Sequence, residues 1–256
     1  MESLTTQIPF QSLYIRQDYI KIYENIKPYL NKHPYRILIT GTPGIGKSMF
    51  TYYMMWKLMQ DNIFKDHHFF FQLKANVILY FKGNNVVELN ESETRRIMFN
   101  LKGKYILFAD ITEVCEPFTF NGITIVFAGP DRMRYKEFMK VDFTYKQYMD
   151  PWSMEEIFAV RNKLYPNLSD EQVISVYNKF GGVLRYVLPQ NEHASGIMKE
   201  AVDKAQAIQM ITESSHMKAD DDSIFFHYIC DDKSIKTKAK LTFASDYVAA
   251  IFKNNF

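Results

Sequence analysis

The sequence has few cysteines and no large excess of charge of either sign. Only two of its 256 residues are cysteines, Cys115 and Cys230, and their spacing fits neither a disulfide framework nor a zinc-binding motif. Lysine and arginine number 31 against 29 aspartate and glutamate residues, so the net charge of +2 permits nucleic-acid binding without arguing for it. The scarcity of cysteine favours a reducing compartment.

Long apolar runs are also missing. No stretch approaches the roughly 18 residues that a membrane-spanning helix requires. Residues 1–7 lack the basic and apolar regions of a signal peptide. Internal repeats and low-complexity linkers are absent as well. The lack of a signal peptide and of a membrane-spanning run predicts an intracellular protein with no membrane contact.

Aromatic residues, by contrast, are abundant. The 21 Phe and 17 Tyr supply much of the apolar area that a core must bury. Core packing explains this content better than a stacking platform for nucleic-acid bases does. The chain length suits one large domain, or a core with a smaller domain attached.

The chain is organised around a glycine-rich segment, residues 41–48, which reads GTPGIGKS and matches the phosphate-binding pattern GxxxxGK[ST] in full. The apolar run 35–40 predicts a strand before it, and residues 49–58 predict a helix after it. Glycines let backbone N–H groups turn toward one anion, and the helix N-terminus adds partial positive charge there. The sequence therefore predicts a bound nucleoside triphosphate. The residues predicted to bind it are Gly41, Thr42, Pro43, Gly44, Ile45, Gly46, Lys47, Ser48 and Met49.

Three residues have predicted roles in phosphate and metal chemistry. Lys47 would reach the β- and γ-phosphates, and the Ser48 hydroxyl would coordinate Mg²⁺. The apolar run 104–110 ends in Asp110, which predicts a buried strand that carries this carboxylate to the same Mg²⁺ ion. The sequence thus predicts Mg²⁺-dependent nucleotide hydrolysis.

The residue that would activate water is less well defined. Many ATPases place a glutamate directly after the metal-binding aspartate, but Ile111 stands at that position here. Glu113 is the nearest substitute, and Glu116 is a poorer one. Weak or conditional turnover is therefore the expectation.

The rest of the first 150 residues predicts an α/β core. A helix is expected over residues 11–32, and Arg16 or Tyr19 on it would either approach the nucleotide base or only pack. Further strands are expected at 75–81, 122–130 and 143–149, with a short arm at 86–89 and a helix at 91–101. Strands alternating with helices predict a P-loop NTPase fold of the AAA-like or STAND-like kind, a parallel sheet with helices on both faces.

A turn after residues 122–130 carries further polar candidates. Asp131 is expected to cap a helix over residues 132–140. Asp131, Arg132 and Arg134 are weak candidates for sensing the γ-phosphate, and either arginine could instead complete the site of a neighbouring copy. Ligands bind at the carboxyl ends of parallel strands, where these residues and Asp110 are expected to lie.

From residue 151 the pattern is helical. Capping boxes at 153–156 and 169–172 predict helices ending near residues 164 and 180, the second closed by a left-handed cap at Gly181-Gly182. A longer helix is expected through about residue 211. Arg185 is the candidate for stabilising transition-state charge, with a structural ion pair as the alternative. The predicted domains are a P-loop core over 1–150, a helical lid over 151–212 and a C-terminal segment over 213–256.

The C-terminal segment is predicted to contain a turn, a strand and a helix. Residues 220–222 are acidic but lack calcium-binding spacing, so they predict a solvated turn. Residues 223–230 read as a strand and residues 243–252 as a helix. Four lysines, at 233, 236, 238 and 240, predict a solvated face or a contact with a phosphate backbone.

Several of these blocks together resemble the P-loop ATPase module of the Crinkler effectors and of the related retrotransposon hot spot proteins. The blocks are residues 16–19, 41–48, 151–156, 164–166, 180–188 and 243–245. The resemblance covers nearly the whole chain and implies an AAA-like ATPase of the signal-transduction type, a nucleotide-controlled switch or motor. It implies ATP and Mg²⁺ as cofactors and action in the nucleus, for some Crinklers that of a host cell.

Two departures limit what the resemblance implies. Many relatives carry a targeting header and a nuclease-like or kinase-like effector domain, and no nuclease cluster of carboxylates and lysine is visible here, so toxicity and DNA cleavage are not carried over. Leu184 stands where relatives tend to have proline, which weakens the assignment of Arg185. Two hypotheses therefore stand side by side: an ATPase, and a hydrolysis-deficient switch that grips a DNA or protein partner. A small-molecule kinase is weaker, and self-association is left open.

Overall fold

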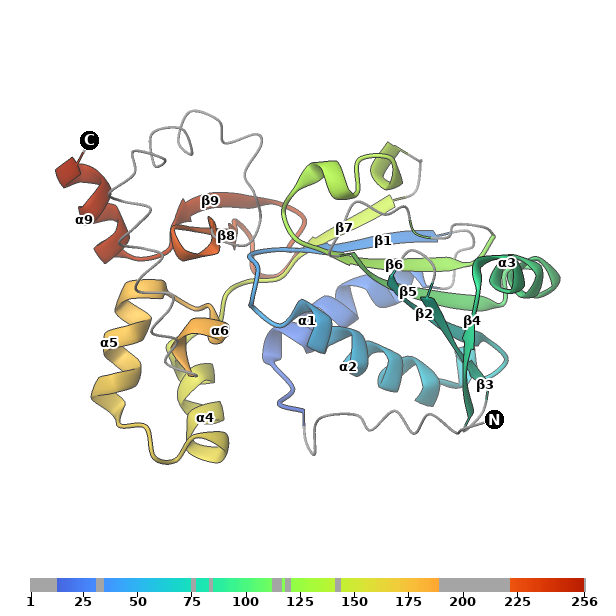
Figure 1. Ribbon diagram of the computed structural model, residues 1–256, viewed down its shortest axis with the longest axis horizontal. Helices are drawn as coiled ribbons and strands as arrows, with labels where there is room; N and C mark the ends of the chain where they lie inside the picture. The colour runs from blue at the N-terminus through green and yellow to red at the C-terminus, as the bar shows by residue number, and fades with distance from the viewer. Residues whose placement is uncertain are drawn as a thin grey trace.

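The structure is a computed structural model, shown in Figure 1, and the element labels used below are those of the figure. It describes residues 13–30, 35–74, 77–82, 85–111, 117, 121–140, 144–188 and 222–255. Within these residues no helix is both long enough and apolar enough to cross a bilayer. The predicted helix through residue 211, Glu113 and Glu116 all lie outside the described residues.

The centre of the molecule is a seven-stranded sheet in the order β4-β3-β2-β5-β6-β1-β7. Its strands are β1 (Tyr35–Thr40), β2 (His68–Lys74), β3 (Val77–Lys82), β4 (Asn85–Leu89), β5 (Tyr105–Ile111), β6 (Ile123–Ala128) and β7 (Thr144–Tyr148). The five strands from β2 to β7 in this order are parallel, whereas β3 pairs antiparallel with both β2 and β4. The sheet is therefore mixed: five strands form the predicted parallel sheet, and the predicted short arm at 86–89 is β4, which pairs antiparallel with β3. Strand β2 was not predicted. The connection between β2 and β3 is too short for a crossover, so the two strands pair antiparallel.

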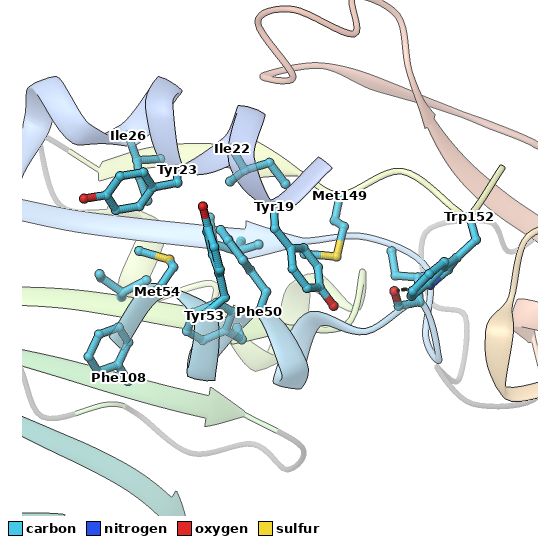
Figure 2. Close-up of a cluster of buried hydrophobic side chains, with 14 of the residues drawn as sticks. Tyr19, Ile22, Tyr23, Ile26, Phe50, Tyr53, Met54, Phe108, Met149 and Trp152 are labelled. Atoms are coloured by element: carbon cyan, nitrogen blue, oxygen red, sulfur yellow. Dashed lines mark hydrogen bonds between the residues drawn. The ribbon is translucent and has the colours of Figure 1, made fainter. Parts of the chain in front are cut away.

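One face of the sheet is covered by α1 (Gln17–Ile26) and α2 (Lys47–Gln60), which lie side by side in Figure 1. An apolar stripe on α1 packs against α2 and the sheet, as Figure 2 shows. Tyr19 stacks on Phe50 with ring centroids 5.0 Å apart, and Phe50 meets Phe127 of β6 edge-on. The aromatic content thus serves this core, as predicted. The predicted helix over 11–32 is shorter in the structure, because Lys27–Tyr29 turns into a 3₁₀ helix that contains Pro28.

The opposite face carries α3 (Glu91–Asn100) and two 3₁₀ turns, η3 (Arg132–Arg134) and η4 (Phe138–Lys140). Asn90 caps α3, as predicted. Its side-chain oxygen accepts a hydrogen bond from the Glu93 N–H, and the Glu93 carboxylate accepts one from the Asn90 N–H. The predicted helix over 132–140 is wrong. Asp131 does cap this segment by accepting from the Met133 N–H, but only a 3₁₀ turn follows.

The helices α4 (Met154–Leu164), α5 (Asp170–Phe180) and α6 (Leu184–Val187) lie beside the sheet (Figure 1). Both predicted capping boxes are confirmed, at Ser153 and Ser169. Gly181 has φ 61° and ψ −153°, so the predicted left-handed cap is wrong although the positive φ favours glycine. Gly182 approaches Trp152 so closely that a Cβ there would lie 2.1 Å from the Trp152 carbonyl oxygen. This contact fixes the start of α6 against the chain that enters α4.

The C-terminal segment forms η5 (Asp222–Ile224), a hairpin of β8 (Phe226–Cys230) and β9 (Ala239–Phe243), and α9 (Asp246–Asn255). The predicted strand and helix are confirmed, whereas β9 was missed. Lys236, expected on a solvated face, is 1% exposed. Its ammonium lies between the carboxylates of Asp18, at 2.6 Å, and Asp150, at 2.5 Å. This buried ion cluster joins the hairpin to α1 and to the end of β7.

Candidate functional site

The glycine-rich segment forms the turn between β1 and α2, as predicted. Gly41, Gly44 and Gly46 have φ values of 149°, 80° and 102°, which residues with side chains rarely adopt. Space also demands glycine at all three: a Cβ would lie 2.6 Å from the Met149 carbonyl oxygen at Gly41, 2.9 Å from Val183 at Gly44 and 2.6 Å from the Tyr19 hydroxyl at Gly46. The turn is thus shaped by its own glycines and by neighbours from both ends of the chain.

The outer side of this turn is held by hydrogen bonds to its carbonyl groups. The Ile45 carbonyl accepts from Arg16 Nη1 at 3.1 Å and from Trp152 Nε1 at 2.8 Å. The Gly46 carbonyl accepts from the Tyr19 hydroxyl at 2.8 Å. Figure 2 shows Tyr19 near the start of α2 and Trp152 beside the turn. These carbonyls are therefore committed to hydrogen bonds with α1 and with the chain that enters α4.

Arg16 is the centre of this outer support. It is 1% exposed, lies over the Trp152 ring at 4.3 Å, and pairs with Glu156 of α4 at 3.0 Å. It also donates to the carbonyls of Asp150 and Pro151. Burial of a guanidinium is tolerable only when its donors are satisfied, and these bonds satisfy them. Arg16 thus connects α1, the phosphate-loop candidate and α4 in one network.

The C-terminal hairpin contacts the same turn. The backbone N–H of Tyr228 donates to the Thr42 hydroxyl at 3.0 Å. The hairpin is tied to the core by the Lys236 ion cluster and by a bond from the Tyr148 N–H to the Lys236 carbonyl at 2.8 Å. The Thr42 side chain therefore faces the hairpin and serves as a link to it.

The inner side of the turn differs, because its donors are not used. Among the described residues, the backbone N–H groups of Gly44 and Gly46 make no recorded intramolecular hydrogen bond. The Lys47 ammonium lies over the turn and donates to the carbonyls of Gly41, at 2.9 Å, and Thr42, at 2.8 Å. The N-terminus of the 14-residue helix α2 lies directly behind. Unused N–H donors, a helix N-terminus and a lysine together favour an anion at this point.

A cavity of about 710 Å³ opens on this inner side. It is bounded by the turn and α2, by the ends of β5 and β6, by η3, and by α4 and α6. Its lining residues are Pro43, Gly44, Gly46, Lys47, Ser48, Met49, Asp110, Ile111, Gly129, Arg134, Trp152, Val160, Leu164, Tyr165, Leu184, Arg185 and Leu188. The volume falls within the range of small-molecule sites.

Most of the predicted site residues meet in this cavity. Asp110, from β5, lines it together with Lys47 and Ser48 of α2. Gly41, Thr42 and Ile45 are not part of the lining, since Gly41 lies against the Met149 carbonyl and the other two face the outer support. Within the described part of the lining, Asp110 is the one carboxylate. The described residues thus include no second acid in the cavity wall.

The predicted Arg185 also lies at the cavity. It is exposed, and a Cβ at Gly44 would lie 3.3 Å from Arg185 Nε. Among the described residues it forms no ion pair, so the alternative of a structural salt bridge has no support there. Arg134 lines the cavity as well and pairs with Asp131 at 3.5 Å, whereas Arg132 is not in the lining. The described part of the lining therefore combines one carboxylate, that of Asp110, with three cations: Lys47, Arg134 and Arg185.

The sequence left the roles of Arg16 and Tyr19 open. Of the two alternatives, packing is the one observed: neither residue lines the cavity, and both donate hydrogen bonds to carbonyls of the turn. Burial raises the pKa of Tyr19 well above its usual range, so its hydroxyl stays a neutral donor. The apolar wall of the cavity, formed by Trp152, Leu164 and Leu188 among others, was not foreseen. Its only sequence signal was the Pro-Trp pair before the first capping box.

Comparison with known proteins gives distant matches. No protein-family model matches the chain. It is 29% identical over 201 residues to Crinkler effector protein 15 of Phytophthora infestans. This match covers 71% of the chain and 29% of that protein. Crinkler effector protein 16 of the same organism is 29% identical over 197 residues, covering 70% and 28%. The chain thus spans less than a third of the length of these relatives.

Among solved structures, the chain is similar to a closed-state cryo-electron-microscopy reconstruction of Hsp104 with ATPγS and FITC casein. The TM-score is 0.44 and the identity 12%, over 81% of this chain and 41% of the other. A similarity at this level does not establish a shared fold. The Crinkler matches agree with the resemblance seen in the sequence blocks.

Proposed function

We propose that the cavity binds a nucleoside triphosphate with Mg²⁺, and that the chain is a Crinkler-like ATPase module. The observation that carries this proposal is the pairing of unused N–H donors at Gly44 and Gly46 with Lys47 on the wall of one cavity. A triphosphate is a polyanion, and the three cations of the lining suit it. The distant Crinkler relatives add support from the sequence.

The residues present fit the proposed ligands. The turn and Lys47 would hold the phosphates, and Lys47 would exchange its present carbonyl partners for phosphate oxygens. The Ser48 hydroxyl and the Asp110 carboxylate are oxygen ligands of the kind that Mg²⁺ takes beside phosphates. Bound Mg²⁺ would neutralise charge that develops on the phosphates. The apolar wall around Trp152 and Leu188 would take the base.

In this proposal Arg185 stabilises charge on the terminal phosphate. It lies beside Gly44 on α6, so an ordered triphosphate would draw it and α6 toward the turn. Arg134 would supply a second cation, already oriented by Asp131. Glu113 stays the candidate for orienting water, as the sequence alone proposes it.

The decisive experiment is titration of the chain with ATP and Mg²⁺ by calorimetry, followed by phosphate-release assays. Lys47→Ala should weaken binding at least about tenfold, because a charge-assisted phosphate contact is worth about 1.5–3 kcal/mol. Lys65→Ala, at an exposed lysine beyond the same helix, is the matched control and should bind as the wild type does. Equal binding by Lys47→Ala and wild type would place the nucleotide elsewhere and overturn the proposal.

A second candidate function is a nucleotide-dependent switch that hydrolyses ATP negligibly. It is favoured by the position after Asp110, where Ile111 stands and cannot activate water. ATP binding without phosphate release, with and without added DNA, would support the switch. Release that depends on Lys47 would support the enzyme, and stimulation by DNA would identify a nucleic-acid partner. Self-association and nuclear action are further parts of the proposal, to be tested by sedimentation and by localisation of a tagged chain.

A further inference from the structure

A second group of cations lies at the seam between β7, the η3 segment and the C-terminal hairpin. Lys146 projects from β7 on the same face as Tyr148, and its ammonium is 4.4 Å from the Tyr148 ring centroid and 5.9 Å from that of Tyr135. Tyr148 in turn stacks on Tyr228 of β8 with centroids 6.2 Å apart. Rings from β7 and from the end of η3 thus lie next to one half-buried lysine, and the hairpin ring of Tyr228 stacks on one of them.

No described carboxylate balances this charge. Lys146 forms no ion pair within the described residues, and neither does Arg132, whose carbonyl accepts from the N–H of Tyr135, the residue whose ring lies by Lys146. Burial, together with the positive charge of Arg132, lowers the pKa of Lys146 to about 8. Within the described residues, the favourable interactions recorded for this ammonium are its two cation–π contacts, and a contact of this kind contributes about 0.5–2 kcal/mol. Two neighbouring cations without a counter-charge are a destabilising arrangement that a bound anion would relieve.

This group is distinct from the cavity of the proposed function. Gly129 lines that cavity, whereas the next residue, Pro130, accepts a hydrogen bond from the Tyr135 hydroxyl at 3.1 Å. Arg134 faces the cavity from η3, but Arg132 and Lys146 are not among its lining residues. The Gly129-Pro130 turn therefore has the cavity on one side and the Lys146 group on the other.

We propose that Lys146 and Arg132 form a second anion site that takes a phosphate group. A phosphate can carry two negative charges, which matches two unpaired cations better than a single carboxylate does. Arg132 is exposed on its turn and offers the planar donor set that suits phosphate oxygens. Lys146 supplies the fixed charge at the base of the site, held by Tyr148. The phosphate comes either from a small phosphorylated molecule or from a nucleic-acid backbone.

The test is protection of Lys146 from acetylation at pH 7.5, quantified by peptide mass spectrometry. Two probes are used separately: inorganic phosphate and a single-stranded oligothymidylate. A bound dianion that raises the pKa of Lys146 by about one unit should slow its acetylation about five- to tenfold. Lys136, an exposed lysine of the same segment, should change less than about twofold and is the internal reference.

Variants separate the two sites and the two sources. Arg132→Gln should lose most of the protection, whereas Lys136→Gln, with the same change of charge, should keep it. Protection must persist in Lys47→Ala, because its loss there would assign the effect to the main cavity and overturn the second site. Protection by both probes supports a general phosphate site. Protection by inorganic phosphate alone identifies a small ligand, and protection by the oligonucleotide alone identifies a nucleic-acid backbone. Failure of both probes overturns the proposal.

Discussion

The two sides of the turn between β1 and α2 differ sharply in how their polar groups are used. On the outer side, the carbonyls of Ile45 and Gly46 and the hydroxyl of Thr42 all accept hydrogen bonds, from α1, from the start of α4 and from the C-terminal hairpin. On the inner side, the N–H groups of Gly44 and Gly46 have no recorded partner within the described residues. The turn is thus rigid where it meets the protein and open where it meets the cavity.

This contrast teaches how a site can be organised before its ligand arrives. Fixing the carbonyls outward leaves the N–H groups with a defined direction, so little order remains to be created on binding. Changes on the outer side should therefore reduce stability first, and changes on the inner side should reduce binding first. Four predictions test that division: three change a residue of the turn, of its supports or of the start of α2, and one titrates the hairpin that contacts the turn.

The largest effect should come from Arg16→Ala. Removing this buried guanidinium leaves the half-buried Glu156 carboxylate without its cation and the carbonyls of Asp150 and Pro151 without their Arg16 donors, which should cost about 3–5 kcal/mol in the free energy of unfolding. Urea denaturation followed by fluorescence measures it. Arg95→Ala is the control, since Arg95 is exposed and pairs with Glu91 on the surface of α3, and it should change stability by less than about 1 kcal/mol. Similar losses of stability in both variants would show that the Arg16 network does not stabilise the fold more than a surface ion pair does.

Acid should weaken the outer side next. His227 of β8 is 2% exposed, and burial lowers its pKa from 6.5 to about 4. The folded chain therefore keeps this imidazole neutral while the unfolded chain protonates it. Stability from this residue is complete above about pH 6.5 and falls as the pH drops toward 4, by up to about 3 kcal/mol.

The measurement for His227 is the free energy of unfolding between pH 7.5 and about pH 4.5, compared with a His227→Gln variant. The wild type should lose more stability than the variant across this window, because glutamine does not titrate. Parallel pH profiles would show that His227 contributes nothing to the acid sensitivity of the hairpin.

A smaller loss is expected for Thr42→Val, which keeps the shape but removes the hydroxyl that accepts from the Tyr228 N–H. An unsatisfied backbone donor costs about 1–3 kcal/mol. Hydrogen exchange of the Tyr228 amide, observed by NMR, should accelerate in the variant. Thr237→Val, at a half-buried threonine between β8 and β9, is the matched control. An unchanged exchange rate at Tyr228 would separate the hairpin from the turn.

The smallest change in stability should come from the inner side. Ser48→Ala removes an exposed hydroxyl that has no recorded partner among the described residues, so the free energy of unfolding should move by less than about 0.5 kcal/mol. If the proposed function holds, binding of ATP should lose its dependence on Mg²⁺ in this variant while ATP alone still binds. A stability loss comparable to that of Arg16→Ala would contradict the division between the two sides.

Much of the fold follows from local patterns. The strand, turn and helix around residues 35–60 and the capping boxes at Ser153 and Ser169 are local features, so the sequence predicted them. The pairing of β2 with β3 and of β8 with β9 depends on which strand lies beside which, and no local pattern contains that information. The segment 132–140 shows the opposite failure, since residues with helical spacing form 3₁₀ turns against the sheet.

The candidate site divides in the same way. Lys47, Ser48 and Asp110 were predicted from strand ends and a glycine pattern, and the structure brings them to one cavity. Arg185 was predicted from a bend and lies there too. The apolar wall, the outward role of Arg16 and the Lys146 group were not predicted in this way, because each depends on contacts between segments more than a hundred residues apart or between separate elements.

By itself the sequence determined where the phosphate-loop candidate lies and why it turns, because glycine conformations and helix starts are set by neighbouring residues. Only the tertiary structure decided what each polar group does. Arg16, Lys236 and Lys146 are all basic residues in the sequence. Folding places the first in a hydrogen-bonded network, the second between two carboxylates and the third beside aromatic rings, with no ion pair to any residue that the structure describes. The role of a charge depends on the groups that surround it, and distant segments supply those groups.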